Sequence, residues 1–381
     1  MKLIFGFFPV LFVVVFSAFI FAACPAEVEE DSGPTIYTAG YYYMDSVSTA
    51  CYWENEDRFD LALPSGAADS GAHSLAVSGG NIYIAGWYEE GGVKKACYWK
   101  DGIRVDFDLP SGATDAEAHS LTVSGANIFS AGHYDRGGVK KACFWKNGKE
   151  FDLDLPAGAV NGRASALAVS DSGDNICIAG NYEDGGDDTA CYWKNTWRVS
   201  LDSGTGGGAL AAAVSETLVL SGGAVTTVKP DYYIAGYYDK DGVKRACYWK
   251  NGTKTDLAGG DGGAANAIAL MDENSGAANA VVPAGKNIYI AGHYESGGVK
   301  RACYWKNGEK IDLADGDNGV ANAIAFFGGH VYFAGSCQNS GGSSAACYWK
   351  NGKKINLEAG SGESYAQALW VADENPASDE L

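Results

Sequence analysis

A four-residue motif, Ala-Cys-Tyr-Trp, occurs seven times in this chain and constrains its fold more than any other feature. Its copies are Ala50–Trp53, Ala96–Trp99, Ala142–Trp145 (with Phe144 in place of tyrosine), Ala190–Trp193, Ala246–Trp249, Ala302–Trp305 and Ala346–Trp349. Successive cysteines of the motif are 46, 46, 48, 56, 56 and 44 residues apart. A period near about 45 residues is typical of a propeller blade or of a large solenoid repeat.

Each repeat predicts four short strands separated by turns. In the second copy these strands cover residues 73–78, 82–88, 95–100 and 105–109, and glycine-rich or Asp-Gly turns lie between them. Four such strands make one antiparallel blade of a propeller. The first strand of a repeat is rich in small residues, as in 164–170, 209–215 and 321–325. Small side chains suit the innermost strand of a blade, where the blades crowd together, so the pattern favours a closed ring over a solenoid.

The two ends of the repeat array predict how the ring closes. The first copy begins at its second strand, residues 36–40, whereas the segment 366–372 after the last copy has the pattern of a first strand. A C-terminal strand that completes the first blade removes the exposed sheet edges of an open array. We therefore predict an all-β, seven-bladed β-propeller of four-stranded antiparallel blades over residues 35–373, followed by a polar tail, residues 374–381.

Turn signals and two insertions refine this prediction. Asn-Gly pairs at 147–148, 251–252, 307–308 and 351–352 predict two-residue type I′ turns, whereas Asn55 and Asn195 are not followed by glycine and suggest longer turns. In the fifth copy, Tyr232 follows Leu210 by 22 residues where nine is usual, so the extra segment should project as a loop or hairpin. The sixth copy has a similar insertion, and either Asn266 or Asn279 could head its inner strand.

The N-terminus has the features of an export signal. Lys2 precedes an apolar run over residues 3–23, and the run ends in Phe21-Ala-Ala-Cys24. This end resembles the lipobox of bacterial lipoproteins. The resemblance implies a signal peptide over residues 1–23, lipidation at Cys24, and an acidic tether over residues 24–34. The alternatives are an ordinary cleaved signal and an uncleaved anchor helix, because 21 apolar residues can span a bilayer. The expected location is outside the cytoplasm, anchored by lipid to a bacterial membrane, either the outer membrane or the cell surface.

The other nine cysteines do not predict a disulfide framework. Seven of them occupy the same place in successive repeats, and equivalent positions in neighbouring blades should lie beyond the roughly 7 Å Cα limit for a disulfide. Cys177 and Cys337 replace tyrosines of the repeat. We expect these cysteines to act as small buried apolar residues.

The charge of the chain excludes one class of partner. A formal net charge of −19 gives no electrostatic basis for binding nucleic acid, and it would repel anionic lipid. The predicted membrane contact is therefore the N-terminal lipid alone. The remaining candidate partners are a glycan or another protein.

Candidate ligand-binding residues come from two positions that vary between otherwise similar repeats. One follows the Ala-Gly pair of the second strand, and the other heads the first strand. The first set is Tyr41, Trp87, His133, Asn181, Tyr237, His293 and Ser336. The second set is His73, His119, Ser165, Leu210, Asn266 or Asn279, Asn322 and Gln367. Aromatic rings and amides around a channel mouth suit sugars and peptides. The alternative is that these positions are solvated strand ends that vary because nothing constrains them.

From these two sets we select nine candidates for ligand binding: Tyr41, His73, Trp87, His119, His133, Tyr237, His293, Asn322 and Gln367.

No metal site, cofactor or catalytic residue is predicted. His73 and His119 should lie on adjacent inner strands, but no third ligand is evident, and zinc sites need at least three protein ligands. The acidic glycine-rich segments 259–263 and 315–319 offer too few oxygens for calcium and are expected to be turns. No nucleophile elbow, phosphate loop or dinucleotide motif is present.

The segment Gly91–Lys100, Gly-Gly-Val-Lys-Lys-Ala-Cys-Tyr-Trp-Lys, resembles repeats of predicted surface lipoproteins of spirochaetes. The resemblance implies a repeat-bearing surface lipoprotein that forms a seven-bladed propeller, and it carries no functional residues over. Three functions stay open: a binding or protein-interaction scaffold, a carbohydrate-active enzyme (hydrolase or lyase) with its site at the channel mouth, and a structural or antigenic surface protein without a small ligand.

Overall fold

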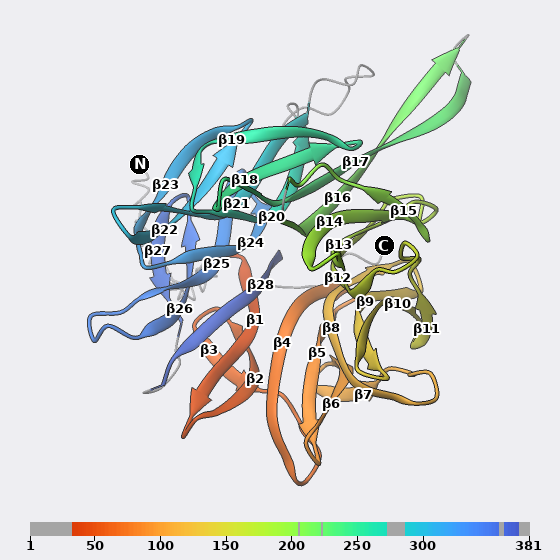
Figure 1. The fold of residues 1–381 in the computed structure, drawn as a ribbon. Coiled ribbons are helices and arrows are strands. Elements are labelled where there is room, and N and C mark those ends of the chain that lie inside the picture. Colours follow the sequence, from red (N-terminus) through yellow and green to blue (C-terminus); the bar gives the residue numbers. More distant parts are fainter. Residues whose placement is uncertain (1–32, 205, 222–223, 273–285, 358–361, 373–381) are drawn as a thin grey trace, which may run out of the picture. The chain divides into compact units, whose positions relative to one another are not determined.

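The computed structural model describes residues 33–204, 206–221, 224–272, 286–357 and 362–372. Within these residues it consists of 28 strands in seven four-stranded antiparallel sheets, which surround a central axis as the blades of a β-propeller (Figure 1). The predicted fold class is confirmed. The predicted signal peptide, Cys24 and the predicted polar tail lie outside the described residues. In the described part of the chain, no helix is long and apolar enough to cross a membrane.

The blades are numbered here by the copy of the motif that they contain, and their strands are given from the axis outward. Blade 1 contains β28 (Ser364–Ala372), β1 (Thr35–Met44), β2 (Val47–Glu54) and β3 (Asp57–Asp60). Blade 2 contains β4 (Ala67–Ser78), β5 (Asn81–Glu90), β6 (Val93–Lys100) and β7 (Ile103–Asp106). Blade 3 contains β8 (Ala113–Ser124), β9 (Asn127–Arg136), β10 (Val139–Lys146) and β11 (Lys149–Asp152). Blade 4 contains β12 (Val160–Val169), β13 (Ile176–Asp184), β14 (Asp187–Lys194) and β15 (Trp197–Ser200).

Blade 5 contains β16 (Gly207–Ser221), β17 (Ala224–Lys240), β18 (Val243–Lys250) and β19 (Thr253–Asp261). Blade 6 contains β20 (Ala264–Asp272), β21 (Lys286–Ser296), β22 (Val299–Lys306) and β23 (Glu309–Asp317). Blade 7 contains β24 (Val320–Phe327), β25 (His330–Gln338), β26 (Ser344–Lys350) and β27 (Lys353–Asn356). Compared with the prediction for the second copy, the inner strand begins six residues earlier, at Ala67, and the outer strand ends at Asp106.

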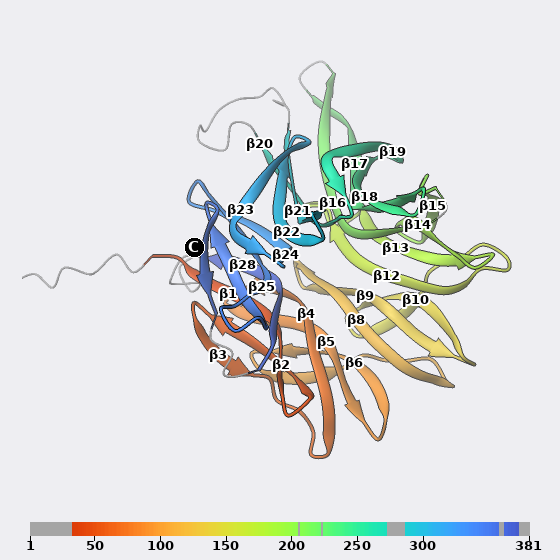
Figure 2. The ribbon, with the colours of Figure 1, turned by 60° about the vertical axis from the view of Figure 1, so that its left-hand side comes forward.

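The C-terminal strand closes the first blade, as predicted. β28 pairs antiparallel with β1, from Thr35 opposite Ala372 to Tyr42 opposite Ser364. Strands from the two ends of the chain therefore lie in one sheet (Figure 2). The ring closes through main-chain hydrogen bonds, and the N-terminal strand has a partner on both sides.

The tryptophan of the motif joins neighbouring blades. All seven of these side chains are fully buried. Within the described residues, the tryptophans of blades 2 to 7 donate their indole N–H to a main-chain carbonyl in or just after the outermost strand of the preceding blade, as Trp99 does to Ala62 at 2.8 Å. The core is correspondingly divided into seven apolar clusters, and each cluster contains residues of two adjacent blades. Burial of apolar surface between blades, at about 25 cal/mol per Å², therefore holds the ring together.

The nine described cysteines are buried free thiols, which agrees with the predicted role as small core residues. Blade 7 differs from the others. There the Sγ atoms of Cys337 on β25 and Cys347 on β26 lie 3.0 Å apart, a contact that the sequence did not suggest.

The outer hairpins use two-residue turns in all seven blades. The expectation of longer turns in the first and fourth copies is wrong, since β2 and β3 are joined by Asn55-Glu56 and β14 and β15 by Asn195-Thr196. Both asparagines have positive φ, near 56°. The asparagine alone is thus sufficient for the turn, because it tolerates the left-handed region better than most residues.

The two insertions differ in structure. In blade 5, β16 and β17 continue past the other strands as a long hairpin, which projects from the ring (Figure 1). In blade 6 the inner strand is β20, so Asn266 lies in the sheet. Asn279 and the rest of residues 273–285 lie outside the described residues.

Candidate functional site

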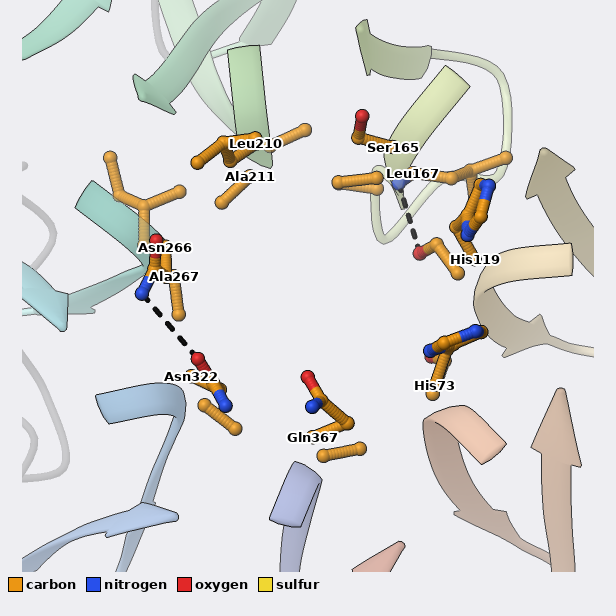
Figure 3. Close-up of a pocket in the computed structure, with 18 of the residues that line it drawn as sticks. His73, His119, Ser165, Leu167, Leu210, Ala211, Asn266, Ala267, Asn322 and Gln367 are labelled. Carbon is orange, nitrogen blue, oxygen red and sulfur yellow. Dashed lines mark hydrogen bonds between the residues drawn. The ribbon is translucent and has the colours of Figure 1, made fainter. Parts of the chain in front are cut away.

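The innermost strands of all seven blades line a central cavity of about 780 Å³ (Figure 3). Its wall has a polar ring and an apolar ring. The apolar ring consists of the side chains two residues after each member of the polar ring. They are Leu75, Leu121, Leu167, Ala212, Ile268, Ile324 and Leu369. A concave site with an apolar wall and a few directed polar groups is typical of a ligand pocket.

A β-bulge in each inner strand forms the polar ring, in which Leu210 is the one apolar member. The pairing with the second strand shifts register at the same place in every blade, and one residue per blade is left without a pairing partner. The seven bulged residues are His73, His119, Ser165, Leu210, Asn266, Asn322 and Gln367, and all seven line the cavity. Because a bulge re-aims the side chain of its extra residue, seven equivalent bulges direct seven side chains at one space.

The invariant glycine of the Ala-Gly pair is a consequence of this bulge. It lies opposite the residue before the bulge, and a Cβ atom at Gly86 would overlap the carbonyl oxygen of Gly71. The equivalent overlap exists at Gly40, Gly132, Gly180, Gly236, Gly292 and Gly335. The conserved spacing of the repeat therefore reflects a steric requirement of the site-forming strand.

Five of the nine sequence-predicted ligand residues line the cavity: His73, His119, Tyr237, Asn322 and Gln367. Four do not. Trp87 and His133 lie behind the two lining histidines and contact them. Tyr41 stacks on Tyr365 with ring centroids 5.3 Å apart, and burial raises its pKa to about 12.

His293 is the fourth residue outside the cavity wall. Its Nδ1 is buried without a hydrogen-bond partner among the described residues. Burial lowers the pKa of His293 to about 4.

Two lining asparagines have a structural task. Asn266 donates to the carbonyl oxygen of Ala321 in the next blade at 3.2 Å, and Asn322 donates to that of Ala366 at 3.0 Å. On the other side of the ring, serine hydroxyls next to the bulges make similar links, as Ser120 does by accepting from the Leu167 N–H at 3.0 Å. Asn322 is thus partly occupied by inter-blade bonding, whereas Gln367 makes no hydrogen bond within the described part of the chain.

A cluster of three histidines occupies the wall between blades 2, 3 and 4. The Trp87 indole N–H donates to Nε2 of His73 at 3.1 Å. Nε2 of His119 lies 3.0 Å from Nδ1 of His133, whose Nε2 lies 3.0 Å from the Lys140 ammonium. The rings of His73 and His119 are 5.4 Å apart.

Burial keeps all three imidazoles neutral at neutral pH. It lowers the pKa of His73 to about 4, and with the Lys140 charge it lowers that of His133 to about 3. Burial and the Arg163 charge hold the pKa of His119 well below its usual range. Neutral imidazole offers one N–H donor and one bare nitrogen, so the cluster is a set of directed hydrogen-bonding groups.

The sequence did not point to three charged residues here: Arg163 and Asp188, which line the cavity, and Glu117, which lies beside His73 and His119. Glu117 binds the Lys94 ammonium at 2.7 Å. Burial opposes ionisation of this carboxyl, but the hydrogen bond and charge of Lys94 outweigh it and lower the pKa of Glu117. Nη2 of Arg163 lies 3.4 Å from Nδ1 of His119. Asp188 accepts from the Asn181 amide at 2.8 Å.

Two of these residues, Glu117 and Arg163, belong to a pair of repeat positions whose residue types vary together. Glu117 and Arg163 occupy the position two residues before the bulge, which faces the variable residue after Ala-Gly across the sheet. Where that residue is Trp87 or Tyr237, the facing residue is Gly71 or Gly208, over which the ring lies. The two positions vary together because they share one volume. This relation needs the strand register, which the sequence alone did not supply.

A metal ion fits this cluster poorly. His73, Glu117 and His119 can each bring one ligand atom within 4.8 Å of the others, so a third candidate ligand exists where the sequence analysis found none. However, the Trp87 N–H already occupies Nε2 of His73, and Lys94 occupies Glu117. A divalent ion would also join Lys94, Lys140 and Arg163 in one small region, where like charges repel.

Comparisons with known proteins extend only to structures. No family model matches the sequence, and no curated protein matches it. Among solved structures, the chain is similar to a prolyl endopeptidase, with 11% identity, a TM-score of 0.42, and coverage of 90% of this chain and 51% of that one.

A puromycin-hydrolysing peptidase of Mycobacterium tuberculosis shows 12% identity and a TM-score of 0.47, with coverage of 85% of this chain and 53% of that one. The β-propeller domain of the Trilobed protease of Pyrococcus furiosus shows 13% identity and a TM-score of 0.43, with coverage of 84% of this chain and 94% of that one. The chain spans about half the length of the two peptidases. The architecture of this protein, a closed seven-bladed β-propeller, is defined by its own strand pairing.

Proposed function

We propose that this protein is an exported, lipid-anchored binding propeller that holds an oxygen-rich polar ligand, such as a glycan, in its central cavity. The observation that carries the proposal is the ring of seven bulged residues. Each bulge interrupts a ladder of main-chain hydrogen bonds and requires a glycine opposite it. Seven equivalent bulges at one level of the ring place seven side chains around one cavity, which favours a site over unconstrained strand ends.

The chemistry of the ring suits hydroxyl groups. It presents imidazole, hydroxyl and amide groups at His73, His119, Ser165, Asn322 and Gln367, which can both donate and accept hydrogen bonds. The apolar ring beside it suits the carbon faces of a sugar. The apolar ring would contribute affinity by burying the ligand, and the polar ring would fix the ligand's orientation.

The same lining favours binding over hydrolysis of a glycan. Glycoside hydrolysis normally uses two carboxyl groups that flank the scissile bond. Among the described residues that line the cavity, Asp188 is the sole acid, and it is held by Asn181. A binding module is therefore the function that the described lining supports best.

The binding proposal is tested by screening the full-length chain, in detergent, on a glycan and peptide array. Wild-type protein should bind a subset of glycans saturably, and Gln367→Ala should weaken that binding because it removes a free amide from the ring. Trp197→Ala is the matched control, since Trp197 is 80% exposed on the outermost strand of blade 4 and does not line the cavity. Glycan binding that survives Gln367→Ala and Tyr237→Ala alike would contradict a cavity site.

The membrane anchor is a separate part of the proposal. It is supported by the apolar run over residues 3–23 and by Cys24 directly after Ala22-Ala23. Metabolic labelling with a radioactive fatty acid should mark the wild-type protein and leave Cys24→Ser unlabelled. Equal labelling of both would exclude Cys24 as the lipidated residue.

A further inference from the structure

Four side chains in the cavity wall form a continuous row of nitrogen contacts. Lys140 Nζ lies 3.0 Å from His133 Nε2, His133 Nδ1 lies 3.0 Å from His119 Nε2, and His119 Nδ1 lies 3.4 Å from Arg163 Nη2. The row begins and ends with a cation. His119 and Arg163 line the cavity, and His133 and Lys140 lie behind them.

This row has fewer hydrogen-bond acceptors than contacts. Ammonium and guanidinium groups only donate, and a neutral imidazole has a single bare nitrogen. Three contacts therefore share two acceptors, those of His133 and His119. Protonating either ring would remove a further acceptor. In any arrangement of the protons, one contact must bring two N–H groups face to face.

The mismatch lies at the contact between His119 and Arg163. That contact is the longest of the three, and both of its residues reach the cavity. Lys140 donates to Nε2 of His133, so His133 carries its proton on Nδ1 and donates it to Nε2 of His119. His119 then carries its own proton on Nδ1, toward Arg163. Two donors that face each other need an oxygen that accepts from both.

Neighbouring groups also lack a hydrogen-bond acceptor or a negative counter-charge. Trp87 donates to Nε2 of His73, so His73 keeps its proton on Nδ1 in the same wall. Lys94 is neutralised by Glu117 at 2.7 Å, and Lys140 lies 3.9 Å from Asp135. Arg163 has no carboxylate within ion-pair distance among the described residues. One uncompensated positive charge thus stands beside imidazole N–H groups at the cavity wall.

We propose that this wall binds the carboxylate of an acidic sugar, with one carboxylate oxygen between Arg163 and His119. The inference rests on the proposed function and specifies its ligand. A single free guanidinium matches the single charge of a carboxylate better than the higher charge of a phosphate monoester. Ser165 lies beside Arg163 on β12, and Gln367 faces the same cavity for the sugar hydroxyls. A metal ion would require the bare nitrogens that the row already lacks.

The test compares D-glucuronate with D-glucose, which differ only in the carboxylate, by isothermal titration calorimetry on the full-length chain. Charge-assisted hydrogen bonds contribute about 1.5–3 kcal/mol, so wild type should prefer glucuronate by roughly 10- to 100-fold. Arg163→Gln should abolish the preference and leave the melting temperature unchanged, since Arg163 is exposed and has no ion pair with any described residue. Arg136→Gln makes the same charge change at the end of β9, away from the cavity lining, and should keep the preference.

Three outcomes would overturn the inference. Equal binding of both sugars, independent of Arg163, would exclude a carboxylate site and leave the proposed glycan-binding function standing. Displacement of glucuronate by inorganic phosphate at lower concentration would assign the site to phosphate groups. Binding of neither sugar, combined with no glycan ligand on the array, would remove the acidic-sugar inference and the proposed function together.

A separate observation in blade 7 carries a second inference. Cys337 takes the place of a tyrosine whose hydroxyl, in blades 1, 2, 3 and 6, hydrogen-bonds an aspartate of the outer strand, as Tyr88 does with Asp106. Its thiol instead meets Cys347 at 3.0 Å across neighbouring strands. The hydrogen bond from Cys347 and the nearby Lys354 ammonium lower the pKa of Cys337.

We infer that Cys337 and Cys347 form a disulfide when the protein meets a small-molecule or protein disulfide as oxidant. The Cys337 thiolate attacks one sulfur of the oxidant and releases its other half as a thiolate. Cys347 then loses its proton and attacks the mixed disulfide, so that the second half leaves as a thiolate. Two thiols are oxidised, one external disulfide is reduced, and two protons are released.

Peptide mapping tests this inference directly. The tryptic peptide 311–350 contains Cys337 and Cys347 and no other cysteine. After exposure to oxidised glutathione, unfolding in denaturant, alkylation and digestion, it should be unalkylated and lighter by two hydrogen atoms. The peptide with Cys97 should be fully alkylated, because its neighbour is Tyr88. Alkylation of both blade 7 thiols would overturn the inference. Cys337→Tyr, which restores the residue of the other blades, should leave Cys347 alkylated.

Discussion

At the scale of single residues, the most constrained position is the glycine of the Ala-Gly pair. Its neighbour across the sheet is the carbonyl that precedes the bulge, and the two backbones approach too closely for any side chain. The repeats keep this glycine because they keep the bulge. The sequence shows that the position is constant, but the steric cause is visible only in the pairing.

Gly86→Ala should therefore destabilise the protein strongly. Relief of the overlap with the Gly71 carbonyl requires the bulge to shift, and we expect a loss of at least ~2 kcal/mol in the free energy of unfolding, measured by urea denaturation. Gly206→Ala is the control, because a Cβ there would lie 3.6 Å from Asp239 Cβ in ordinary contact. Equal stability of the two variants would refute the steric explanation.

The buried histidines predict a dependence of stability on pH. The pKa of His73 falls from 6.5 to about 4 on folding, so between these values the unfolded chain binds a proton that the folded chain does not. The stabilisation is complete above pH 6.5 and is lost as the pH falls toward 4, at about 1.4 kcal/mol for each unit of pKa difference. His73→Gln should make the fall in unfolding free energy over this range shallower.

The exposed His330 supplies the control for this measurement. His330→Gln is the matched control for loss of an imidazole, since the side chain is exposed at the start of β25 and hydrogen-bonds Asn351. Identical slopes in wild type and His73→Gln would show that burial of His73 does not shift its protonation.

At the scale of elements, the turn between the two outer strands depends on an Asn or Asp side chain. In every blade its oxygen accepts a main-chain N–H of the second strand, as Asn147 does from Ile128 at 2.9 Å and Asp101 from Ile82 at 2.8 Å. In the sequence, the Asn-Gly pair is the apparent signal for this turn. The structure shows that the glycine is dispensable, because the side-chain bond and the positive φ both belong to the first residue.

Asn147→Ala should consequently cost about 1–2 kcal/mol of stability, from the lost hydrogen bond and the strained φ. Asn147→Asp should cost little, because Asp101 performs the same task in blade 2. Melting temperatures of the three proteins check this order. A loss in Asn147→Asp as large as that in Asn147→Ala would show that the side-chain acceptor is not what matters.

At the scale of the whole molecule, stability depends on closing the ring. The cluster between blades 7 and 1 includes Leu369 and Val371 of β28 together with Trp53, so one short strand completes both a sheet and an inter-blade core. Folding of the first and last blades is thereby coupled across more than 300 residues of sequence. Contacts of such long range slow folding, because the entropy of closing the intervening chain is lost before the contact forms.

Leu369→Ala should lower the free energy of unfolding by about 2–4 kcal/mol, as is usual when a buried leucine is truncated. Trp370→Ala, at the next residue, should have a much smaller effect because Trp370 is 39% exposed. Calorimetry of both variants tests the closure. A small effect of Leu369→Ala would mean that the ring does not depend on β28.

The sequence by itself determined the number of blades, the strand that closes the ring and the column of residues that faces the axis, because a repeat compared with itself separates constant packing positions from variable ones. Only the tertiary structure decided which of these side chains contact one another. The bulge, the donor row from Lys140 to Arg163 and the thiol pair of blade 7 arise from contacts across strands and between blades. Such contacts depend on register and on distances between segments tens of residues apart, which no local pattern in the chain contains.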